Sequence, residues 1–335
     1  MSERDRVTIY DVADRAGVAI STVSRVLNDS SDVADGTRKR VLDAIDYLQY
    51  RPQRSARTLA HSEARSLAVA VPTFTSYFYN EILKGVKDRL EDEDTDLLLF
   101  NLGSRSPEET LLRFLERGAV DALLLATLSV EGELHRELKR LRAPVLLVGQ
   151  ESEEFDCFFW DDVLGARRAV EHLLDRGHRR IGMIAAHPWS HSAEQRIRGY
   201  RTALEEAGLE VDDALIQTGS TQKHAGYSEE AGFEAMEALL ERASDLTAVF
   251  AGSDVQAIGA AKALRDRGRA IPNDVALVGY DNIKLSRFLD FTTIDHHLHE
   301  IGLRATRLLL RRMQGDEEPS VREFIEPDLI VRGSS

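Results

Sequence analysis

The stretch TIYDVADRAGVAISTVSRVLN, residues 8–28, decides the organisation of this chain. Thr8 is followed three positions later by Asp11, a pattern that predicts a capped helix start with a carboxylate at the positive end of the helix dipole. This first helix runs over about 9–15 and ends before Gly17, which can adopt the left-handed backbone of a tight turn. A second helix follows the turn, so the spacing predicts a helix-turn-helix.

The second helix, over about 20–28, has two different faces. Its apolar side carries Val23, Val26 and Leu27, and its other side carries Ser21, Thr22, Arg25 and Asn28. The polar side offers hydroxyl, amide and guanidinium groups to a partner. A third helix is predicted over 35–50, where apolar residues recur at helical spacing and complete a small core. A generic three-helix bundle is the alternative.

The segment RPQRSARTLAHS, residues 51–62, predicts a basic hinge after the third helix. Its arginines are Arg51, Arg54 and Arg57. A short helix here places Ala56 and Leu59 on one side and the arginines on the other. An apolar side chain among arginines is typical of a wedge inserted into a DNA minor groove. The alternative is a solvated basic linker.

The charge distribution favours nucleic-acid binding by the N-terminal part alone. The whole chain has a formal net charge of -14, from 43 Lys and Arg against 57 Asp and Glu, yet residues 1–60 hold 10 basic and 9 acidic residues. An acidic body repels nucleic acid, so contacts with DNA are expected only where arginines are placed locally.

Cysteine content and hydropathy indicate the compartment. Cys157 is the only cysteine, which excludes an intrachain disulfide and a zinc site of several thiolates. The N-terminus shows no apolar signal region, and the apolar runs are shorter than the ~18 residues that a membrane span needs. We therefore expect a cytoplasmic protein without a membrane anchor.

Taken together, these motifs resemble the DNA-binding head of the LacI/GalR family of bacterial transcriptional regulators, and the similarity continues through most of the chain. The resemblance implies that the second helix enters the major groove with Ile20, Ser21 and Arg25 at base edges. It places Ala56 and Leu59 in the minor groove. The complete set expected to contact DNA or brace the head is Thr8, Tyr10, Ala19, Ile20, Ser21, Thr22, Ser24, Arg25, Asn28, Arg54, Ala56 and Leu59.

Two alanines depart from the family pattern. Ala19 and Ala34 stand where the family usually has a helix-capping serine. Each lost cap costs about 0.5 to 2 kcal/mol, so the head is expected to be marginally stable without DNA unless Asp35 or another neighbour compensates.

The body, residues 61–335, alternates short apolar runs with amphipathic helical stretches, which predicts parallel sheets covered by helices on both faces. The pattern restarts half-way, so we expect two doubly wound lobes with a cleft at the carboxyl ends of their strands. The resemblance implies a periplasmic-binding-protein-like fold whose chain crosses between lobes near residues 161, 294 and 323. The expected domains are a head over 1–50, a hinge over 51–62, a first lobe over 63–161 with 295–322, and a second lobe over 162–294 with 323–335.

Enzyme motifs are missing from this architecture: there is no G-x-G-x-x-G after a strand, no G-x-x-x-x-G-K-[ST] and no G-x-S-x-G. The run DHHLHE, residues 295–300, holds three histidines and two acids at a lobe crossover. It predicts polar hinge or interface contacts, with a metal site as the alternative. Titration of these imidazoles near neutral pH would make the crossover pH-sensitive.

The strand ends supply candidates for an effector site: Tyr79, Asp161, Arg196, Tyr227, Ser253, Asp254 and Asp281. A carboxylate and a guanidinium at two strand ends can hold a polyhydroxylated ligand. By the resemblance, the positions of Arg196 and Asp281 contact the effector, and Tyr79 and Tyr227 wall it in. A helix cap is the alternative for Asp254, and core packing is the alternative for both tyrosines.

We therefore predict a sequence-specific transcriptional regulator, a repressor, whose affinity for operator DNA is controlled by a small molecule. The expected effector is a sugar or sugar derivative, and a purine or nucleoside is the alternative. One helix reads only a half-site, so a homodimer on a palindromic double-stranded operator is expected. No cofactor and no catalytic residue are expected. The rival interpretations are a solute-binding protein and a sugar-processing or nucleotide-processing enzyme.

Overall fold

The computed structural model describes residues 7–27, 30, 32–48, 50, 65–103, 106–116 and 120–335. These residues form two compact units, here called the head (within 7–50) and the body (within 65–335), and each is described by itself. The predictions for Asn28, Arg54, Ala56 and Leu59, and for the hinge as a whole, lie outside the described residues.

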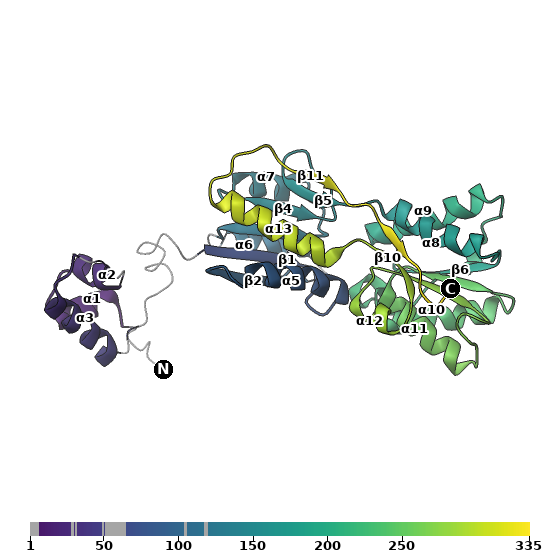
Figure 1. Cartoon of the computed structure of the whole chain (residues 1–335), viewed down its shortest axis with the longest axis horizontal. Helices are drawn as coiled ribbons and strands as arrows, with labels where there is room; N and C mark the ends of the chain where they lie inside the picture. Colours follow the sequence, from purple (N-terminus) through teal and green to yellow (C-terminus); the bar gives the residue numbers. More distant parts are fainter. Residues whose placement is uncertain are drawn as a thin grey trace. The chain divides into compact units, whose positions relative to one another are not determined.

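The head contains the three predicted helices, α1 (Ile9–Ala16), α2 (Ile20–Leu27) and α3 (Asp35–Leu48) (Figure 1). Their apolar faces meet in one core, made of Val12, Ala13, Ala16, Val23, Val26, Val33, Val41, Ala44 and Tyr50. Because small residues dominate this core, the helices can be short and still pack closely.

Local hydrogen bonds explain where α1 begins and ends. The backbone N–H of Thr8 donates to Asp11 Oδ2 over 2.6 Å, and the Thr8 hydroxyl donates to the same oxygen over 2.7 Å. These bonds lower the pKa of the Asp11 carboxyl. Gly17 ends the helix at φ 63° and ψ 44°, which confirms the left-handed turn expected before α2.

The first lobe is built on a six-stranded sheet with the order β11-β5-β4-β3-β1-β2. Its strands are β1 (Arg65–Val71), β2 (Thr95–Asn101), β3 (Ala122–Ala126), β4 (Val145–Val148), β5 (Asp156–Phe159) and β11 (Arg322–Phe324). Its helices are α5 (Tyr77–Leu90), α6 (Pro107–Leu115), α7 (Gly132–Arg140) and α13 (Leu298–Met313). Figure 1 shows α13 lying along this sheet next to α5.

The second lobe is built on a six-stranded sheet with the order β12-β10-β9-β8-β6-β7. Its strands are β6 (Ile181–Ala185), β7 (Ile216–Thr218), β8 (Ala248–Ala251), β9 (Ala276–Tyr280), β10 (Thr292–Asp295) and β12 (Asp328–Ile330). Its helices are α8 (Asp162–Asp175), α9 (His191–Glu206), α10 (Glu229–Arg242), α11 (Asp254–Asp266) and α12 (Lys284–Phe288), with short 3-10 turns η1 (Asp213–Leu215) and η2 (Lys223–Gly226). The strand β12 pairs antiparallel with β10, whereas β10, β9, β8, β6 and β7 pair parallel.

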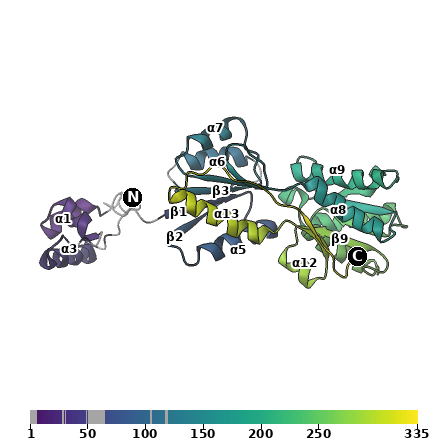
Figure 2. The same ribbon diagram turned by 45° about the horizontal axis from the view of Figure 1, so that its top comes forward.

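Each sheet has an apolar core on both faces, as a doubly wound fold requires. In β1, Leu67 and Val69 face the core beneath α5 and α13, while Ala68 and Ala70 face the opposite core beneath α6 and α7. In the second lobe, α8 and α9 cover one face, where Figure 2 shows them side by side, and α10 and α11 cover the other. The predicted fold class is therefore confirmed.

A close backbone contact fixes α5 against α13. A Cβ added to Gly302 would lie 2.1 Å from the carbonyl oxygen of Ile82, and one added to Gly85 would lie 2.0 Å from that of His299. Glycine at both positions therefore lets these two helices touch through their backbones.

The chain crosses between the lobes after β5, after β10 and after β11. The expected boundary at 322/323 falls inside β11, because Phe324 pairs with Phe159 and the Ile325 N–H still donates to the Phe159 carbonyl over 2.7 Å. Ile325 also packs in the first-lobe core. The third crossing therefore lies at residues 326–327, later than the sequence suggested. Within the described part of the chain, no helix is long and apolar enough to cross a membrane.

Candidate functional site

The polar face of α2 is open to solvent in the head. Ala19, Ile20, Ser21 and Arg25 are exposed, whereas Thr22 and Ser24 are half-buried beside the core residue Val23. Tyr10 at the start of α1 has 66% of its surface exposed. The described residues expected to meet DNA are thus available for contact, while the apolar side of the helix is used for packing.

In the body, residues that follow strand ends of the two lobes meet, and a cleft there is lined by Glu81, Asp281, Asn282, Asp295 and residues 297–300. Two contacts join the lobes there: the Thr75 hydroxyl lies 3.1 Å from His224 Nε2, and the Lys284 backbone N–H donates to Glu81 Oε1 over 3.2 Å. Parallel α/β sheets bind ligands at the carboxyl ends of their strands, so the cleft is the candidate ligand site.

A buried ion cluster includes Asp281, one of these cleft residues. Arg196, only 4% exposed on α9, donates through Nε to Asp162 Oδ1 over 2.9 Å and through Nη1 to the Gly252 carbonyl over 2.5 Å. Its Nη2 lies 3.6 Å from Asp281 Oδ1, which is buried and has no hydrogen-bond partner among the residues that the structure describes. The cluster therefore holds an unpaired carboxylate oxygen next to a cation.

Burial and pairing with Arg196 shift the pKa values of Asp162 and Asp281 in opposite directions. Burial opposes the ionisation of Asp162, but the attraction of Arg196 and two hydrogen bonds outweigh it and lower the pKa of Asp162. Burial raises the pKa of Asp281 well above its usual range, because the attraction of Arg196 only partly offsets the cost of burying the charge and the neighbouring carboxyls of Asp254 and Asp162 add to it. Asp162 is thus the ionised counterion of Arg196, whereas the surroundings of Asp281 favour its protonated form.

Aromatic rings surround the cluster. The Arg196 guanidinium lies 3.8 Å from the ring centroid of Tyr280 and 5.6 Å from that of Tyr227. From the first lobe, the Tyr79 hydroxyl lies 2.5 Å from Thr127 Oγ1, and burial raises the pKa of Tyr79 to about 12. Both tyrosines singled out from the sequence therefore lie near the ion cluster, and Tyr79 also packs against the core of the first lobe.

Two other candidates, Asp161 and Ser253, use their side chains to cap helices of the second lobe. Asp161 caps α8, since its Oδ1 accepts from the Val163 N–H over 2.8 Å and from the Leu164 N–H over 3.1 Å. Ser253 caps α11 by accepting from the Gln256 N–H. Neither side chain joins the hydrogen-bonded cluster around Arg196.

Asp254 holds the loop that carries Asp281, which lies next to Arg196. It is fully buried, and its two oxygens accept from the Thr293 hydroxyl over 2.7 Å and from the Ile283 N–H over 2.9 Å. Because Ile283 follows Asp281 by two residues, this bond fixes the loop that presents the Asp281 carboxyl. Burial raises the pKa of Asp254 to about 6.

The histidines of the 295–300 run have three different surroundings. His297 Nε2 lies 2.8 Å from Asp328 Oδ2, and His299 Nε2 lies 2.9 Å from Asp88 Oδ2. His296 is fully buried near Asp162, and burial lowers its pKa to about 3. His296 therefore remains neutral at physiological pH, so protonation of this ring does not supply the pH response considered from the sequence.

Comparison with known proteins identifies the family to which this chain belongs. Residues 8–53 match the family model described as bacterial regulatory proteins, lacI family, and residues 170–335 match a periplasmic binding protein-like domain. The regulator CelR of Thermobifida fusca is 34% identical over 345 residues, which cover 100% of both chains. This chain belongs to the lacI family of bacterial regulatory proteins.

Other members of the lacI family support this assignment. Catabolite control protein A of Priestia megaterium is 34% identical over 315 residues and covers 92% of each chain. The solved CelR–cellobiose complex has a TM-score of 0.69 at 33% identity, covering 98% of this chain and 100% of that chain. A lac repressor dimer bound to operator and the anti-inducer ONPF has a TM-score of 0.75 at 25% identity, covering 98% and 99%.

In this lacI-family chain, sequence patterns did not identify Asp162, Trp160, Tyr280 and His296 as neighbours of Arg196 or of one another. Asp161 and Asp162 are both aspartates, so a sequence pattern does not distinguish them. Only the position at which α8 begins decides which carboxylate caps the helix. A useful signal was present, because the unusual residues Trp160 and His296 both lie next to a predicted crossover.

Proposed function

We propose that this protein is a DNA-binding transcriptional repressor whose affinity for operator DNA changes when a neutral, hydroxylated small molecule binds between the two lobes of its body. Membership of the lacI family supports the regulatory role. The observation that carries the choice of effector is the buried cluster in which Arg196 already has Asp162 as its ionised partner.

The charge of the cluster favours a neutral ligand. Arg196 is neutralised by Asp162, and a phosphate or carboxylate placed here would meet the Asp281 carboxyl without a free positive partner in the cluster. Hydroxyl groups suit the same atoms well, because they can accept from the guanidinium and exchange hydrogen bonds with Asp281. The aromatic walls fit the apolar face of a ring. A sugar offers both hydroxyl groups and an apolar ring face. We therefore place a sugar or neutral sugar derivative at Arg196 and Asp281, between Tyr79 and Tyr227.

For the DNA-binding head, we propose that α2 lies in the major groove. Ile20, Ser21 and Arg25 would contact base edges, since they are exposed on one side of α2. Thr8, Tyr10, Ala19, Thr22, Ser24 and Asn28 would contact phosphates or brace the head, and Arg54, Ala56 and Leu59 would act at the minor groove. A homodimer would present two heads to a palindromic double-stranded operator. A repressor acts on chromosomal DNA, so we place it in the cytoplasm.

The test uses an operator selected from random DNA by the full-length protein. Thermal shift is measured with neutral monosaccharides, disaccharides and trisaccharides, sugar phosphates, and purine and pyrimidine nucleosides. A ligand at about 100 times its Kd adds ~2.7 kcal/mol of apparent stability, so a true effector gives a clear shift. The compound that stabilises the protein should also change operator affinity. Stabilisation by sugar phosphates alone would overturn the neutral effector, and failure to select any operator would overturn the regulatory role.

A further inference from the structure

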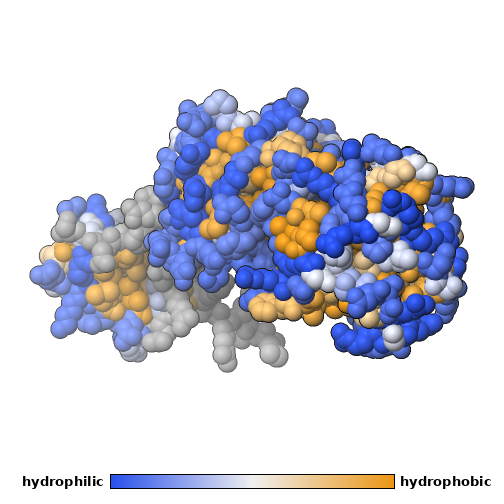
Figure 3. Space-filling view, turned by 45° about the vertical axis from the view of Figure 1, so that its right-hand side comes forward, coloured by the Kyte–Doolittle hydropathy of each residue, from blue (hydrophilic) through white to orange (hydrophobic). Residues whose placement is uncertain are grey.

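A tryptophan is exposed on the second lobe close to the proposed effector site. Trp189 has 63% of its surface exposed, and its ring stacks on His187 with centroids 4.2 Å apart and planes inclined by 7°. Leaving a large aromatic ring in water forgoes the free energy of burial. Figure 3 shows hydrophilic residues over much of the face it presents, with several apolar patches between them. An exposed tryptophan ring stacked on a histidine requires an explanation.

The pair is held rigidly by the loop after β6. The His187 N–H donates to the Ala225 carbonyl over 2.8 Å, and His187 Nε2 lies 2.9 Å from the Thr221 carbonyl oxygen. Because a carbonyl oxygen only accepts, Nε2 carries the imidazole proton and the ring orientation is fixed. Trp189 therefore stacks on a histidine that two hydrogen bonds hold in place.

Trp189 and His187 lie in a loop next to the segment through which the second lobe contacts the first lobe. The loop between β6 and α9 leaves the carboxyl edge of its sheet, where parallel α/β sheets bind ligands. His187 is bonded to the 221–225 segment, and His224 of that segment contacts Thr75 of the first lobe. Next to Thr75, Phe74 is 38% exposed. Aromatic side chains thus occur on both lobes near this contact, Phe74 on the first lobe and Trp189 on the second. We call this region the rim.

Hydroxyl groups connect the loop of Trp189 with the inner site. The Ser190 and Ser192 hydroxyls lie 3.0 Å apart, and Ser192 Oγ lies 2.8 Å from the Tyr227 hydroxyl. Tyr227 in turn faces Arg196. A continuous row of polar groups therefore leads from Trp189 at the rim to the guanidinium inside.

We propose that Trp189 and His187 form an outer subsite for a second sugar ring, so that the effector is a neutral oligosaccharide of at least two rings. The inner ring would lie at Arg196 and Asp281, and the outer ring would place its C–H face on the indole, whose π face is electron-rich. The hydroxyl groups of Ser190, Ser192 and Thr75 would exchange hydrogen bonds with the remaining hydroxyl groups of the sugar. This inference rests on the proposed function, since it extends the same cleft outward.

The test compares Trp189→Ala with wild type by calorimetric titration of the full-length protein. The probes are cellobiose, maltose, lactose, sucrose and trehalose, their trisaccharide homologues, and the constituent monosaccharides. Phe288→Ala is the matched control, because Phe288 is 72% exposed on α12 of the same lobe, outside the rim loop. Thermal unfolding without ligand shows that both variants are folded.

We expect the tightest probe to contain two or more rings. Trp189→Ala should raise its Kd by about 5- to 50-fold, with less than a 2-fold change for the monosaccharides and for Phe288→Ala with any probe. Equal weakening of monosaccharides and oligosaccharides, or a monosaccharide that binds as tightly as every oligosaccharide, would overturn the outer subsite and leave the inner sugar site standing. Binding of nucleosides or sugar phosphates with no binding of any saccharide would overturn both.

Discussion

His296, in the segment that joins β10 to α13, stacks on Trp160 at the end of β5, with ring centroids 4.7 Å apart and planes inclined by 26°. The contact joins the second crossing between the lobes to the first. On its other side, His296 lies 5.0 Å from the ring centroid of Tyr280. Within the described part of the chain, neither ring nitrogen of His296 has a hydrogen-bond partner, although the side chain is fully buried. A ligand hydroxyl in the cleft would satisfy one of them.

Replacing His296 by Phe should therefore have opposite effects on stability and on binding. Phenylalanine keeps the aromatic contact with Trp160 and removes two unpaired polar atoms, so the ligand-free protein should gain about 1 kcal/mol of unfolding free energy. Affinity for the saccharide found in the screen should fall by about 10-fold. Urea unfolding and calorimetric titration measure the two effects.

The control for this change is His299→Phe. His299 is exposed on α13 and pairs with Asp88, so its loss should leave saccharide affinity unchanged. If His296→Phe destabilises the ligand-free protein and binds saccharide normally, His296 serves only the packing of the crossover.

Substitutions of the adjacent acids Asp161 and Asp162 should differ in their effects on protein stability and on effector binding. Asp161→Ala removes the cap of α8 and should cost about 1 kcal/mol without changing effector affinity. Asp162→Ala leaves Arg196 without its ionised partner in a buried site, so effector binding should be lost and stability should fall by about 3 kcal/mol or more. Thermal unfolding and titration of both variants provide the comparison, and equal behaviour of the two would contradict it.

Arg25 on α2 should determine sequence preference. A bidentate contact between arginine and guanine contributes about 1 to 3 kcal/mol of discrimination, so Arg25→Ala should weaken operator binding by about 5- to 150-fold more than binding to scrambled DNA. Fluorescence anisotropy with both duplexes measures the ratio. Arg40→Ala, which removes the same charge from α3, is the control and should affect both duplexes alike. An equal loss on both duplexes with Arg25→Ala would reduce Arg25 to a phosphate contact.

Asp254 should give the second lobe a pH-dependent stability. Because burial raises its pKa to about 6, the folded state holds this proton more tightly than the unfolded state does. The free energy of unfolding should therefore fall as the pH rises from about 4 to 6, by up to about 3 kcal/mol from this group. Asp254→Asn cannot ionise, so the variant should gain stability relative to wild type over that interval. Urea unfolding at pH 4.5 and 7 tests this, and parallel pH profiles of the two proteins would refute it.

Gly302 should be intolerant of any side chain. A Cβ there would lie 2.1 Å from the Ile82 carbonyl oxygen, so Gly302→Ala should push α13 from α5 and cost about 3 kcal/mol. Gly36→Ala on α3 is the control, because no atom lies within 4 Å of its added Cβ. That control should stabilise the head by up to about 1 kcal/mol. Equal thermal stability of Gly302→Ala and wild type would show that the two helices can separate freely.

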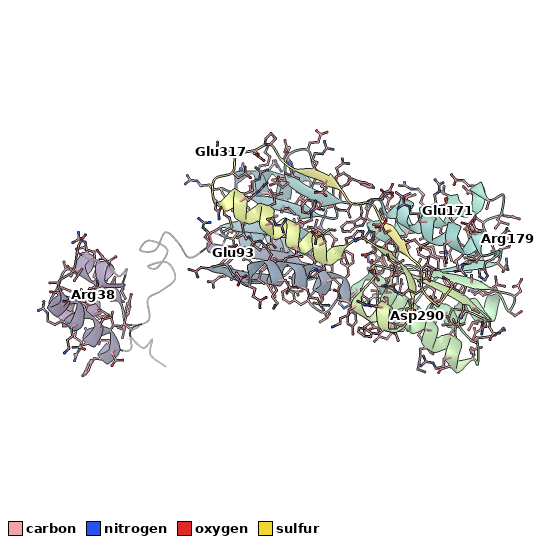
Figure 4. The ribbon with its side chains drawn as sticks, viewed as in Figure 1. Arg38, Glu93, Glu171, Arg179, Asp290 and Glu317 are labelled. Atoms are coloured by element: carbon pink, nitrogen blue, oxygen red, sulfur yellow. The ribbon has the colours of Figure 1, made fainter. Side chains whose placement is uncertain are left out.

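The outer surfaces of the head and lobes carry the charges counted from the sequence. Figure 4 labels Arg38 in the head and Glu93, Glu171, Arg179, Asp290 and Glu317 in the body. Glu171, for example, pairs with Arg167 one turn earlier on α8, at 2.6 Å. Such i,i+4 pairs contribute little to stability, and they could be anticipated from spacing alone.

Local sequence determined the elements of this protein. The capping pair of Thr8 and Asp11, the left-handed Gly17 and the alternation of apolar runs with amphipathic helices depend on neighbours within a few residues, and each appears in the structure as expected. Tertiary structure alone decided which polar groups meet. Arg196 and Asp162 are separated by 34 residues, and Trp160 and His296 by far more, so no periodicity links them. Their neighbours are set by how the two sheets bring distant strand ends together. Burial makes an unpaired charge costly, and Arg196 gains Asp162 as its partner, whereas Asp281 Oδ1 and the ring nitrogens of His296 are buried without a hydrogen bond to any described residue.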